Sequence, residues 1–317
     1  MTAARWAVYE LLAAHVGDDD TVERLCIGLT WSFCETSRGL GFAQSPGMAS
    51  RVLAFPGTLA GMRARELAPW LRSWDPFEAT VGLAATNAAI NTPHNPLLQG
   101  ARHLSGNAPA NLAVFEHFVP RLRNKKVVVI GRYPGLETVL GGLDVTVLER
   151  QPGMHDLPDP AAEYVIPDAD WVFLSSTTLI NKTFTRLATL ARNAVTVLMG
   201  PSTPWLAELA GFGIDFLAGV VPLDERRAMQ IAMEGGGIRL FGDGVVYALA
   251  DIGSGNLDAL KQEIAATSSE RLRLLAEMEA WYGAGRRARF PRHAQLDAVS
   301  DELAALDTRF KRQWDAR

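Results

Sequence analysis

The fold is decided by KVVVIG at residues 126–131, a continuous apolar run that ends in a glycine. Such a run is typical of a strand that is buried on both faces of a parallel sheet. Similar runs follow, separated by helical patterns, at 145–149 (VTVLE), 170–175 (DWVFLS), 194–200 (AVTVLMG), 214–220 and 244–250 (GVVYALA). This alternation predicts a doubly wound α/β domain with a Rossmann-like parallel sheet.

The residues before this sheet have the pattern of a smaller α+β unit. We expect a helix over residues 3–14, one strand over 22–34 (VERLCIGLTWSFC) and a second helix over 77–90. Asp75 is the predicted N-cap of the second helix, and Pro76 lies in its first turn.

The residues after the sheet predict a helical hairpin. Residues 257–282 form a charged amphipathic helix, 283–292 (GAGRRARFPR) a basic turn, and the last helix repeats apolar residues at spacings of three and four. This seam consists of Leu296, Val299, Leu303, Leu306, Phe310 and Trp314. The hairpin either packs back on its own chain or serves as a dimerisation arm, and the length of the seam favours the arm and a homodimer. The expected domains are 1–118, 119–253 and 254–317.

The composition limits the classes of protein to which this chain can belong. The 317 residues are 48% hydrophobic and 21% charged, with a net charge of −4, which is a globular balance. No face is basic enough to follow a phosphate backbone, so we expect no nucleic-acid partner. No apolar stretch approaches about 18 uncharged residues, so we expect no membrane span. Cys26 and Cys34 would share one face of a single strand as free thiols, which is typical of a reducing cytoplasm.

Ligands of doubly wound sheets bind at the carboxyl ends of the strands, so the residues after each strand are candidates. The first strand is followed by Gly131, Tyr133 and Pro134 in a turn that is rich in glycine but lacks the G-x-G-x-x-G pattern. Pro134 also removes an amide donor, which argues against ordinary NAD binding. Glu149 ends the second strand, where related sites hold ribose hydroxyls; a surface carboxylate is the alternative.

Hydroxyl side chains follow the next two strands. SSTTLINKT spans residues 175–183, and GPSTP spans 200–204. One hydroxyl in each turn is expected to cap a helix, while the others face the same edge of the sheet and favour contact with a polar ligand. In the first domain, Asn87 and Asn91 share a helix face and are either packing and capping amides or ligand contacts.

Few residues offer acid–base chemistry. The candidates are Glu149, Asp224, Glu35 and two histidines, His94 and His103, in the irregular connector 92–111. The sequence contains no G-x-S-x-G elbow, no H-E-x-x-H motif and no carboxylates at metal-binding spacing. Catalytic residues and metal ligands therefore stay unassigned, and the sequence leaves open whether the protein is an enzyme.

Several separated motifs, in the same order, resemble the DUF364 family, which is called the putative heavy-metal chelation domain. They are VVVIGRYPG, VTVLERQPG, DADWVFLSSTTLINKT, VTVLMGPSTP and GIDFLAG. The front segment, with FPGTLAG and ARELAPWLRSWDPFEATVGLAATNAAIN, resembles the DUF4213 domain that usually precedes it. The resemblance covers about residues 5–252 and leaves out the tail from 253.

The resemblance implies an enolase N-terminal-like first domain, a Rossmann-like second domain and a shared pocket at their interface. That pocket would use Gly131, Tyr133, Pro134, Glu149, Ser176, Thr177, Asn181, Ser202 and Thr203, with Asn87 and Asn91 from the first domain. Where relatives often read T-G-T or T-G-S, this chain has Ser175-Ser176-Thr177. The missing glycine narrows the approach of a ligand to the backbone.

The resemblance implies a protein that binds a small molecule or a metal complex. It would be an enzyme that acts, in the interdomain pocket, on a metal-chelating, pterin-, flavin- or metallophore-like compound. One alternative is a non-catalytic metal or metallophore carrier. Another is an enzyme that depends on a nucleoside-type cofactor such as S-adenosylmethionine, which Glu149 favours, and a third is an assembly module built on the hairpin. The expected cofactor is thus a transition metal or a nucleoside-type compound.

Overall fold

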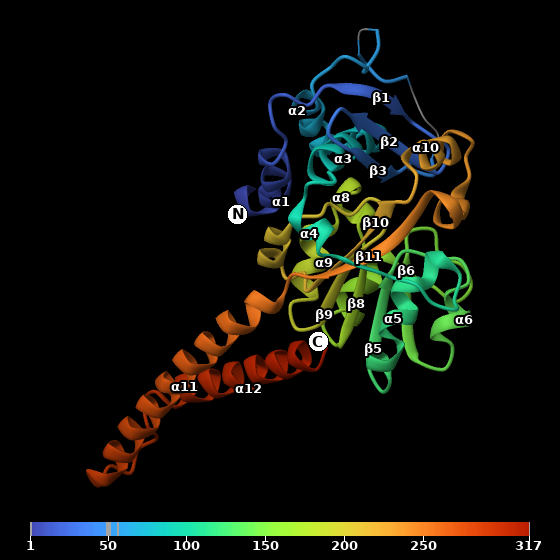
Figure 1. Ribbon diagram of the computed structural model, residues 1–317. Coiled ribbons are helices and arrows are strands. Elements are labelled where there is room, and N and C mark those ends of the chain that lie inside the picture. The colour runs from blue at the N-terminus through green and yellow to red at the C-terminus, as the bar shows by residue number, and fades with distance from the viewer. Residues whose placement is uncertain (1, 49–51, 56, 317) are drawn as a thin grey trace.

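The apolar runs of the second domain pair into one mixed sheet (Figure 1). In the computed structural model, which describes residues 2–48, 52–55 and 57–316, this sheet has eight strands in the order β4-β11-β10-β9-β8-β5-β6-β7. Its strands are β4 (Arg102–His103), β5 (Lys126–Ile130), β6 (Asp144–Glu149), β7 (Leu157–Pro158), β8 (Trp171–Ser175), β9 (Val195–Met199), β10 (Phe216–Pro222) and β11 (Val245–Asp251). The helices are α1 (Thr2–Ala14), α2 (Ala64–Leu67), α3 (Pro76–Ile90), α4 (Pro96–Gln99), α5 (Ala113–Leu122), α6 (Leu136–Leu140), α7 (Ala162–Val165), α8 (Thr177–Ile180), α9 (Phe184–Leu190), α10 (Glu225–Met233), α11 (Ser254–Gly283) and α12 (His293–Asp315).

The strand order locates the point at which the winding of the sheet reverses. The strands from β10 to β7 are parallel to their neighbours, and the five long ones lie in the order 2-1-3-4-5 when numbered along the chain. This is one of the two common doubly wound orders. The chain steps outward from β5 to β6 and then crosses back to β8, so the switch point lies between β5 and β8. The predicted α/β class with a mainly parallel sheet is confirmed.

The last long strand, β11, departs from the expected parallel direction. It runs antiparallel to β10 over its whole length, from Val245 opposite Pro222 to Asp251 opposite Phe216. The reason is that α10 stays at the carboxyl edge of the sheet, beside β2, instead of crossing a face to the amino edge (Figure 1). The chain therefore re-enters the sheet from the edge at which it left.

Apolar clusters fill both faces of the sheet, as continuous apolar strands require. Alternate residues of β5 belong to different clusters. Val127 and Val129 pack in the cluster that contains residues of α5 and α6, whereas Val128 and Ile130 pack in the cluster that contains residues of α7 and α9. The sheet is thus the middle layer of the second domain, and only its two edges are free to form a site.

The first domain is a three-stranded antiparallel sheet with α3 packed across it. Its strands are β1 (Val22–Cys26), β2 (Trp31–Thr36) and β3 (Leu40–Gln44). A Cβ on Gly41 would lie 2.2 Å from both the Ala84 carbonyl oxygen and the Ala88 nitrogen, so only glycine lets β3 lie this close to α3. The enolase-like character of this domain and the division of the chain at 118 and 253 stay predictions.

The predicted single strand over residues 22–34 is wrong. The segment is a hairpin of β1 and β2, because the chain turns at Gly28, where a Cβ would lie 2.3 Å from the Trp31 carbonyl oxygen. Cys26 lies opposite Phe33, and Cys34 lies opposite Leu25. Directly opposed residues share a face, so the two cysteines point to opposite faces of the sheet, and the predicted common face is wrong.

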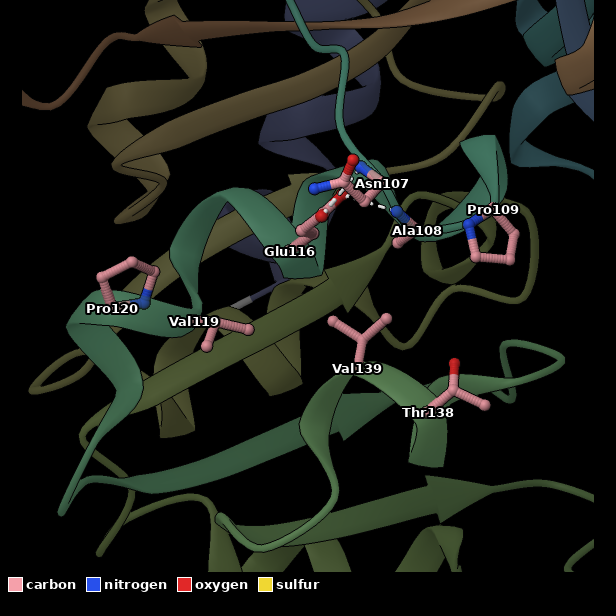
Figure 2. A pocket seen from close by; sticks show the side chains of 8 residues that line it. All are labelled: Asn107, Ala108, Pro109, Glu116, Val119, Pro120, Thr138 and Val139. Atoms are coloured by element: carbon pink, nitrogen blue, oxygen red, sulfur yellow. Dashed lines mark hydrogen bonds between the residues drawn. The ribbon is translucent and has the colours of Figure 1, made fainter.

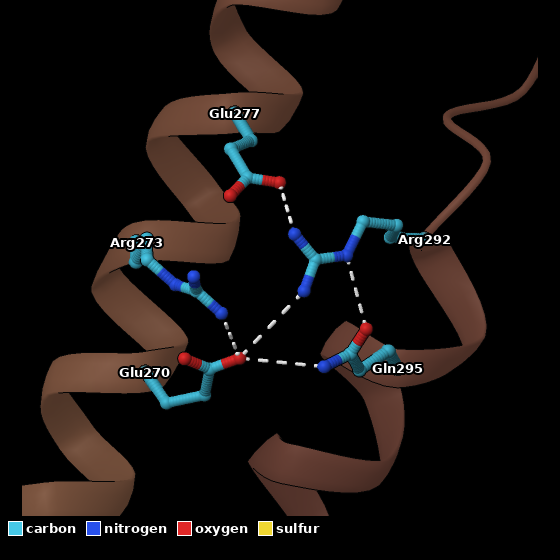
Figure 3. Close-up of polar contacts among 5 residues, drawn as sticks. All are labelled: Glu270, Arg273, Glu277, Arg292 and Gln295. Carbon is cyan, nitrogen blue, oxygen red and sulfur yellow. Dashed lines mark hydrogen bonds and ion pairs between the residues drawn. The ribbon is translucent and has the colours of Figure 1, made fainter.

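The C-terminal residues form the predicted helical hairpin, an arm that leaves the body at the amino edge of the sheet (Figure 1). Glu270 and Glu277 of α11 hold Arg292, which precedes α12, and Glu270 also accepts a hydrogen bond from Gln295 at 3.3 Å (Figure 3). The end of α12 returns to the body, where the Arg312 guanidinium donates to the Asn193 carbonyl oxygen (2.9 Å) and pairs with Asp170 (3.0 Å).

The apolar seam of α12 is covered mainly by α11 of the same chain. Leu296 and Leu306 are buried, while Val299, Leu303 and Phe310 are half-buried. Trp314 is 59% exposed and stacks on Phe310. The seam therefore does not by itself require a second chain, and the homodimer stays a prediction. No helix in the described part of the chain is both long and apolar enough to cross a membrane.

Candidate functional site

The first domain covers the carboxyl edge of the large sheet, where the sequence predicts a site (Figure 1). Two asparagines of α3 and its C-cap hold the domains together. The Asn87 Nδ2 donates to the carbonyl oxygens of Phe42 (2.8 Å) and Ser202 (3.0 Å). The Asn91 Nδ2 donates to the Thr203 carbonyl oxygen (3.1 Å). The structure therefore brings these predicted site residues together, and the two side-chain amides form hydrogen bonds between the two domains.

Further hydrogen bonds close this interdomain seam, by which we mean the contact of residues 44 and 87–95 with residues 176 and 200–205. The Trp205 amide donates to the Asn91 Oδ1 (2.9 Å), and the Asn95 Nδ2 donates to the Trp205 carbonyl oxygen (2.8 Å). The Ser202 Oγ accepts from the Gln44 amide (2.8 Å). Sequence reasoning missed Asn95 and Gln44, because their partners lie more than a hundred residues away and leave no local pattern.

Three buried polar atoms at the seam have no hydrogen-bond partner among the described residues. They are the Asn87 Oδ1, the Ser176 Oγ and the Thr203 Oγ1, on residues that are at most 1% exposed. All three residues border the 200–203 turn: a Cβ on Gly200 would lie 3.1 Å from the Ser176 Oγ, and Asn87 bonds Ser202. Buried polar atoms are nearly always paired, so these three indicate a water molecule or a ligand between the domains.

The switch point itself carries a row of hydroxyls. The Ser175 Oγ lies 2.9 Å from the Thr177 Oγ1 and also shares a hydrogen bond with the Tyr133 hydroxyl. Burial raises the pKa of the Tyr133 phenol well above its usual range, and the bond with Ser175 offsets only part of this shift. Gly131 has a φ of +97°, and a Cβ there would touch the Ser175 side chain at 3.4 Å. The glycine thus lets the β5 turn meet the end of β8.

Glu149 lies beside the turn after β5 and stabilises it through backbone hydrogen bonds. Its Oε2 accepts from the Arg132 amide (2.9 Å), and its Oε1 accepts from the Gln151 amide (3.2 Å). The Arg132 side chain pairs with Asp156, and that hydrogen bond lowers the pKa of the Asp156 carboxyl. The exposed Pro134 uses its carbonyl oxygen to accept from the Asn111 Nδ2 (3.2 Å). A ribose-binding role for Glu149 would have to use its remaining lone pairs.

The turn after α8 places an unusual lysine beside Asn181. The Asn181 Oδ1 accepts from the Thr183 amide (3.2 Å) and hydroxyl (2.6 Å), so its predicted ligand role competes with capping. Lys182 has a φ of +65°, in the left-handed region that favours glycine. Among the described residues, Asn124 is the other non-glycine residue with a positive φ. The Lys182 Nζ donates to the Ile180 carbonyl oxygen (2.7 Å), and burial lowers the pKa of Lys182 to about 8.

The other acid–base candidates are exposed or stabilise local structure. His94 and His103 are exposed, the latter on edge strand β4. Glu35 pairs with Arg24 across β1 and β2 (2.7 Å). Asp224 caps α10 by accepting from the Arg227 amide (3.1 Å).

Open grooves occur elsewhere on the molecule. One of about 500 Å³ lies between the 107–109 loop, α5 and α6 (Figure 2). Its acidic side chain, Glu116, accepts from the Asn107 and Ala108 amides at 3.0 Å each, so the carboxylate holds the loop. Neither this groove nor a second one at the amino edge is lined by a residue of the predicted site.

Two family models match separate segments of the chain. The DUF4213 model, "Putative heavy-metal chelation", matches residues 9–90, and the DUF364 model, with the same description, matches residues 113–251. The chain belongs to the DUF364 family, with a DUF4213 domain in front. Both models end before the helical hairpin, so the hairpin is an addition to the part that this DUF364 protein shares with its family.

Relatives of this DUF364 protein include an uncharacterized protein of Methanocaldococcus jannaschii, 32% identical over 165 residues. The match spans 50% of this chain and 60% of the relative. A DUF364 protein of unknown function from Desulfitobacterium hafniense is 29% identical, with a TM-score of 0.68 over 78% of this chain and 98% of that one. A second, from Pyrococcus horikoshii, is 19% identical and shows the fold alone, with a TM-score of 0.65 over 79% of this chain and 100% of that one.

The family description raises the question of a metal. The described residues contain no group of three or more His, Cys, Asp or Glu side chains placed to hold an ion. The predicted site residues supply hydroxyls and amides, with Glu149 as their carboxylate, and such a set does not fit a transition-metal site made by the protein alone. The roles of the predicted site residues stay predictions, and the family name indicates only a metal-related ligand.

Proposed function

We propose that this DUF364 protein binds a polar small molecule, or a metal enclosed in such a molecule, between the β5–β8 switch point and the first domain, a place that we call the crevice. The observation that carries the proposal is the set of three unpartnered buried atoms on Asn87, Ser176 and Thr203. Each would cost about 1–3 kcal/mol if it stayed unpaired. Two hydroxyls and an amide oxygen fit a ligand with neutral donors and acceptors better than a bare ion.

This proposal reconciles the family description with the donor set. A metal that arrives inside an organic chelate brings its own ligands, so the protein needs to recognise only the polar rim of the complex. Hydroxyls and amides do this without the desolvation cost of a buried charge. A non-catalytic carrier of such a complex is the simplest form of the proposal.

A second candidate is an enzyme that acts on the same ligand. The hydroxyl row of Tyr133, Ser175 and Thr177 favours it, because linked hydroxyls at a switch point can hold and pass a proton. A nucleoside-type cofactor is less favoured, since both oxygens of Glu149 already accept backbone hydrogen bonds.

Native mass spectrometry of the purified protein, combined with elemental analysis, tests the proposal. We expect a small non-covalent adduct that Ser176→Ala weakens or removes. Thr196→Val is the matched control, because the Thr196 Oγ1 is also buried without a partner but lies on β9. An adduct that contains a metal supports the carrier, and a metal-free adduct that the protein converts supports the enzyme. Absence of any adduct, together with a Ser176→Ala variant at least as stable as the wild type, would contradict the proposal.

A further inference from the structure

The root of the hairpin forms a polar groove with the amino edge of the sheet, on the opposite side of the domain from the crevice. The groove has a volume of about 550 Å³. The α12 helix contributes Ala304, Ala305, Thr308, Arg309 and Arg312, and the body contributes Lys126, Pro167, Asp168 and Asn193. Both family models end before α12, so this groove exists only because the hairpin returns to the body.

Two cations in this groove form no ion pair with another described residue. They are the Lys126 ammonium and the Arg309 guanidinium, although Asp168 also lines the groove and the Asp170 carboxylate accepts from the Lys126 amide (2.9 Å). The Arg309 Nε is buried and has no hydrogen-bond acceptor there. A guanidinium keeps its charge at any physiological pH, so the missing acceptor cannot be replaced by loss of a proton.

The neighbouring Arg312, in contrast, has both an ion-pair partner and a hydrogen-bond acceptor. Its guanidinium pairs with Asp170 and donates to the Asn193 carbonyl oxygen, which anchors the end of α12 to the loops before β8 and β9. Arg309 lies one helical turn earlier and has no such partner. Arg309 therefore does not anchor α12 to the body as Arg312 does.

We propose that this groove is a binding site for a small molecule with a multiply charged oxyanion, a phosphate ester or a polycarboxylate. The anionic group would lie between Arg309 and Lys126, and the Thr308 hydroxyl and the Asn193 side chain would contact the polar remainder. Guanidinium and ammonium groups are the usual ligands of such anions, and the charge-assisted bonds they form are about twice as strong as neutral ones. The exposed carboxylate of Asp168 also lines the groove and repels an anion, so the two cations have to outweigh it.

The site would also couple the hairpin to the body. An anion bound by both Arg309 of α12 and Lys126 at the start of β5 would join the two parts. We therefore expect amide hydrogen exchange across residues 304–312 to slow when the anion binds. The crevice at the carboxyl edge plays no part, so this proposal does not depend on the proposed function.

Isothermal titration calorimetry with pyrophosphate and with citrate, at constant ionic strength, tests the proposal on the full chain. We expect saturable binding of at least one anion, weakened about tenfold or more by Arg309→Gln and by Lys126→Gln. Tighter binding of pyrophosphate would indicate a phosphate ester, and tighter binding of citrate would indicate a polycarboxylate.

Lys311→Gln is the matched control, because Lys311 is exposed on the same helix but does not line the groove. It should bind both anions as the wild type does. Melting temperatures without anion show whether each variant folds. The proposal is overturned if neither anion binds saturably, or if Lys311→Gln weakens binding as much as Arg309→Gln does.

Discussion

The interdomain seam and the hairpin root place opposite kinds of polar group at opposite edges of one sheet. The seam is closed by neutral amides and hydroxyls on residues such as Asn87 and Ser202, which are at most 1% exposed. The hairpin root and arm are held by charged side chains such as Arg312 and Arg292, which stay partly hydrated. Burial decides this difference, because a buried neutral group needs only a hydrogen bond, whereas a buried charge needs a counter-ion.

The two regions also differ in what they join. The seam fixes the DUF4213 domain to the DUF364 domain, within the part that the solved relative from Desulfitobacterium hafniense matches over 98% of its length. The hairpin lies beyond the end of both family models. We therefore expect changes at the seam to destabilise the body as a whole and changes in the hairpin to have local effects.

The largest effect that we expect is that of Asn87→Leu. The change leaves the Phe42 and Ser202 carbonyl oxygens unpaired in a buried interface, at a cost of about 1–3 kcal/mol each. Chemical denaturation should show a loss of about 2–5 kcal/mol. The control Gln262→Leu changes an exposed side chain on α11 and should stay within about 0.5 kcal/mol of the wild type. An equal loss in both variants would remove the distinction between the regions.

The next prediction concerns the assembly of the arm. If the exposed Trp314 and its half-buried neighbours pair with a second copy, the full chain should have twice the monomer mass in light scattering. A chain that ends at Gly253 should then be monomeric and should still fold, because the relative from Desulfitobacterium hafniense matches only 78% of this chain. A monomeric full chain would refute the homodimer. A dimer that survives truncation would place the interface on the body.

A smaller effect is expected for Arg292→Met, which removes the ion pairs with Glu270 and Glu277 near the hairpin tip (Figure 3). All three side chains are about one-third exposed, so water already screens the pairs and the loss should be about 1 kcal/mol or less. Hydrogen exchange should accelerate around residues 277–296 and stay unchanged in β8 and β9. Faster exchange in the sheet would show that the arm is not an independent unit.

A further prediction is a pH dependence of stability from Lys182. Burial lowers its pKa to about 8 in the folded protein, against about 10.5 when unfolded. Between these values the unfolded chain binds more protons, so this group makes stability rise as pH increases from about 8 to 10.5. Lys182→Met should remove that part of the slope in denaturation curves, whereas Lys261→Met, at an exposed lysine, should not. Identical slopes in the wild type and in Lys182→Met would show that the amine is solvated.

The sequence predicted features that depend on local patterns. The apolar runs located the long strands, and the rule that ligands meet the carboxyl ends of strands placed Tyr133, Ser176 and Ser202 at one edge. The hairpin between β1 and β2 was missed because VERLCIGLTWSFC has strand-forming residues on both sides of Gly28. The position of that turn depends on packing against the Trp31 backbone, which no pattern reports.

Long-range partners could not be predicted at all. The spacing of Asn87 and Asn91 indicated a shared face, but their partners in the second domain lie 112 to 115 residues further along the chain. The two unpaired cations of the hairpin root were hidden for a different reason. The net charge of −4 describes the whole chain and does not show that Lys126 and Arg309 line the same groove.

A crystal structure of the protein with its co-purified ligand, at a resolution that shows ordered water, tests the central claim most directly. We predict density for a polar, non-protein molecule in the crevice beneath the first domain, within hydrogen-bond distance of the Ser176 Oγ and of at least one of the Asn87 Oδ1 and Thr203 Oγ1. Density for isolated water molecules on these three atoms, with a known ligand bound elsewhere on the chain, would contradict the claim.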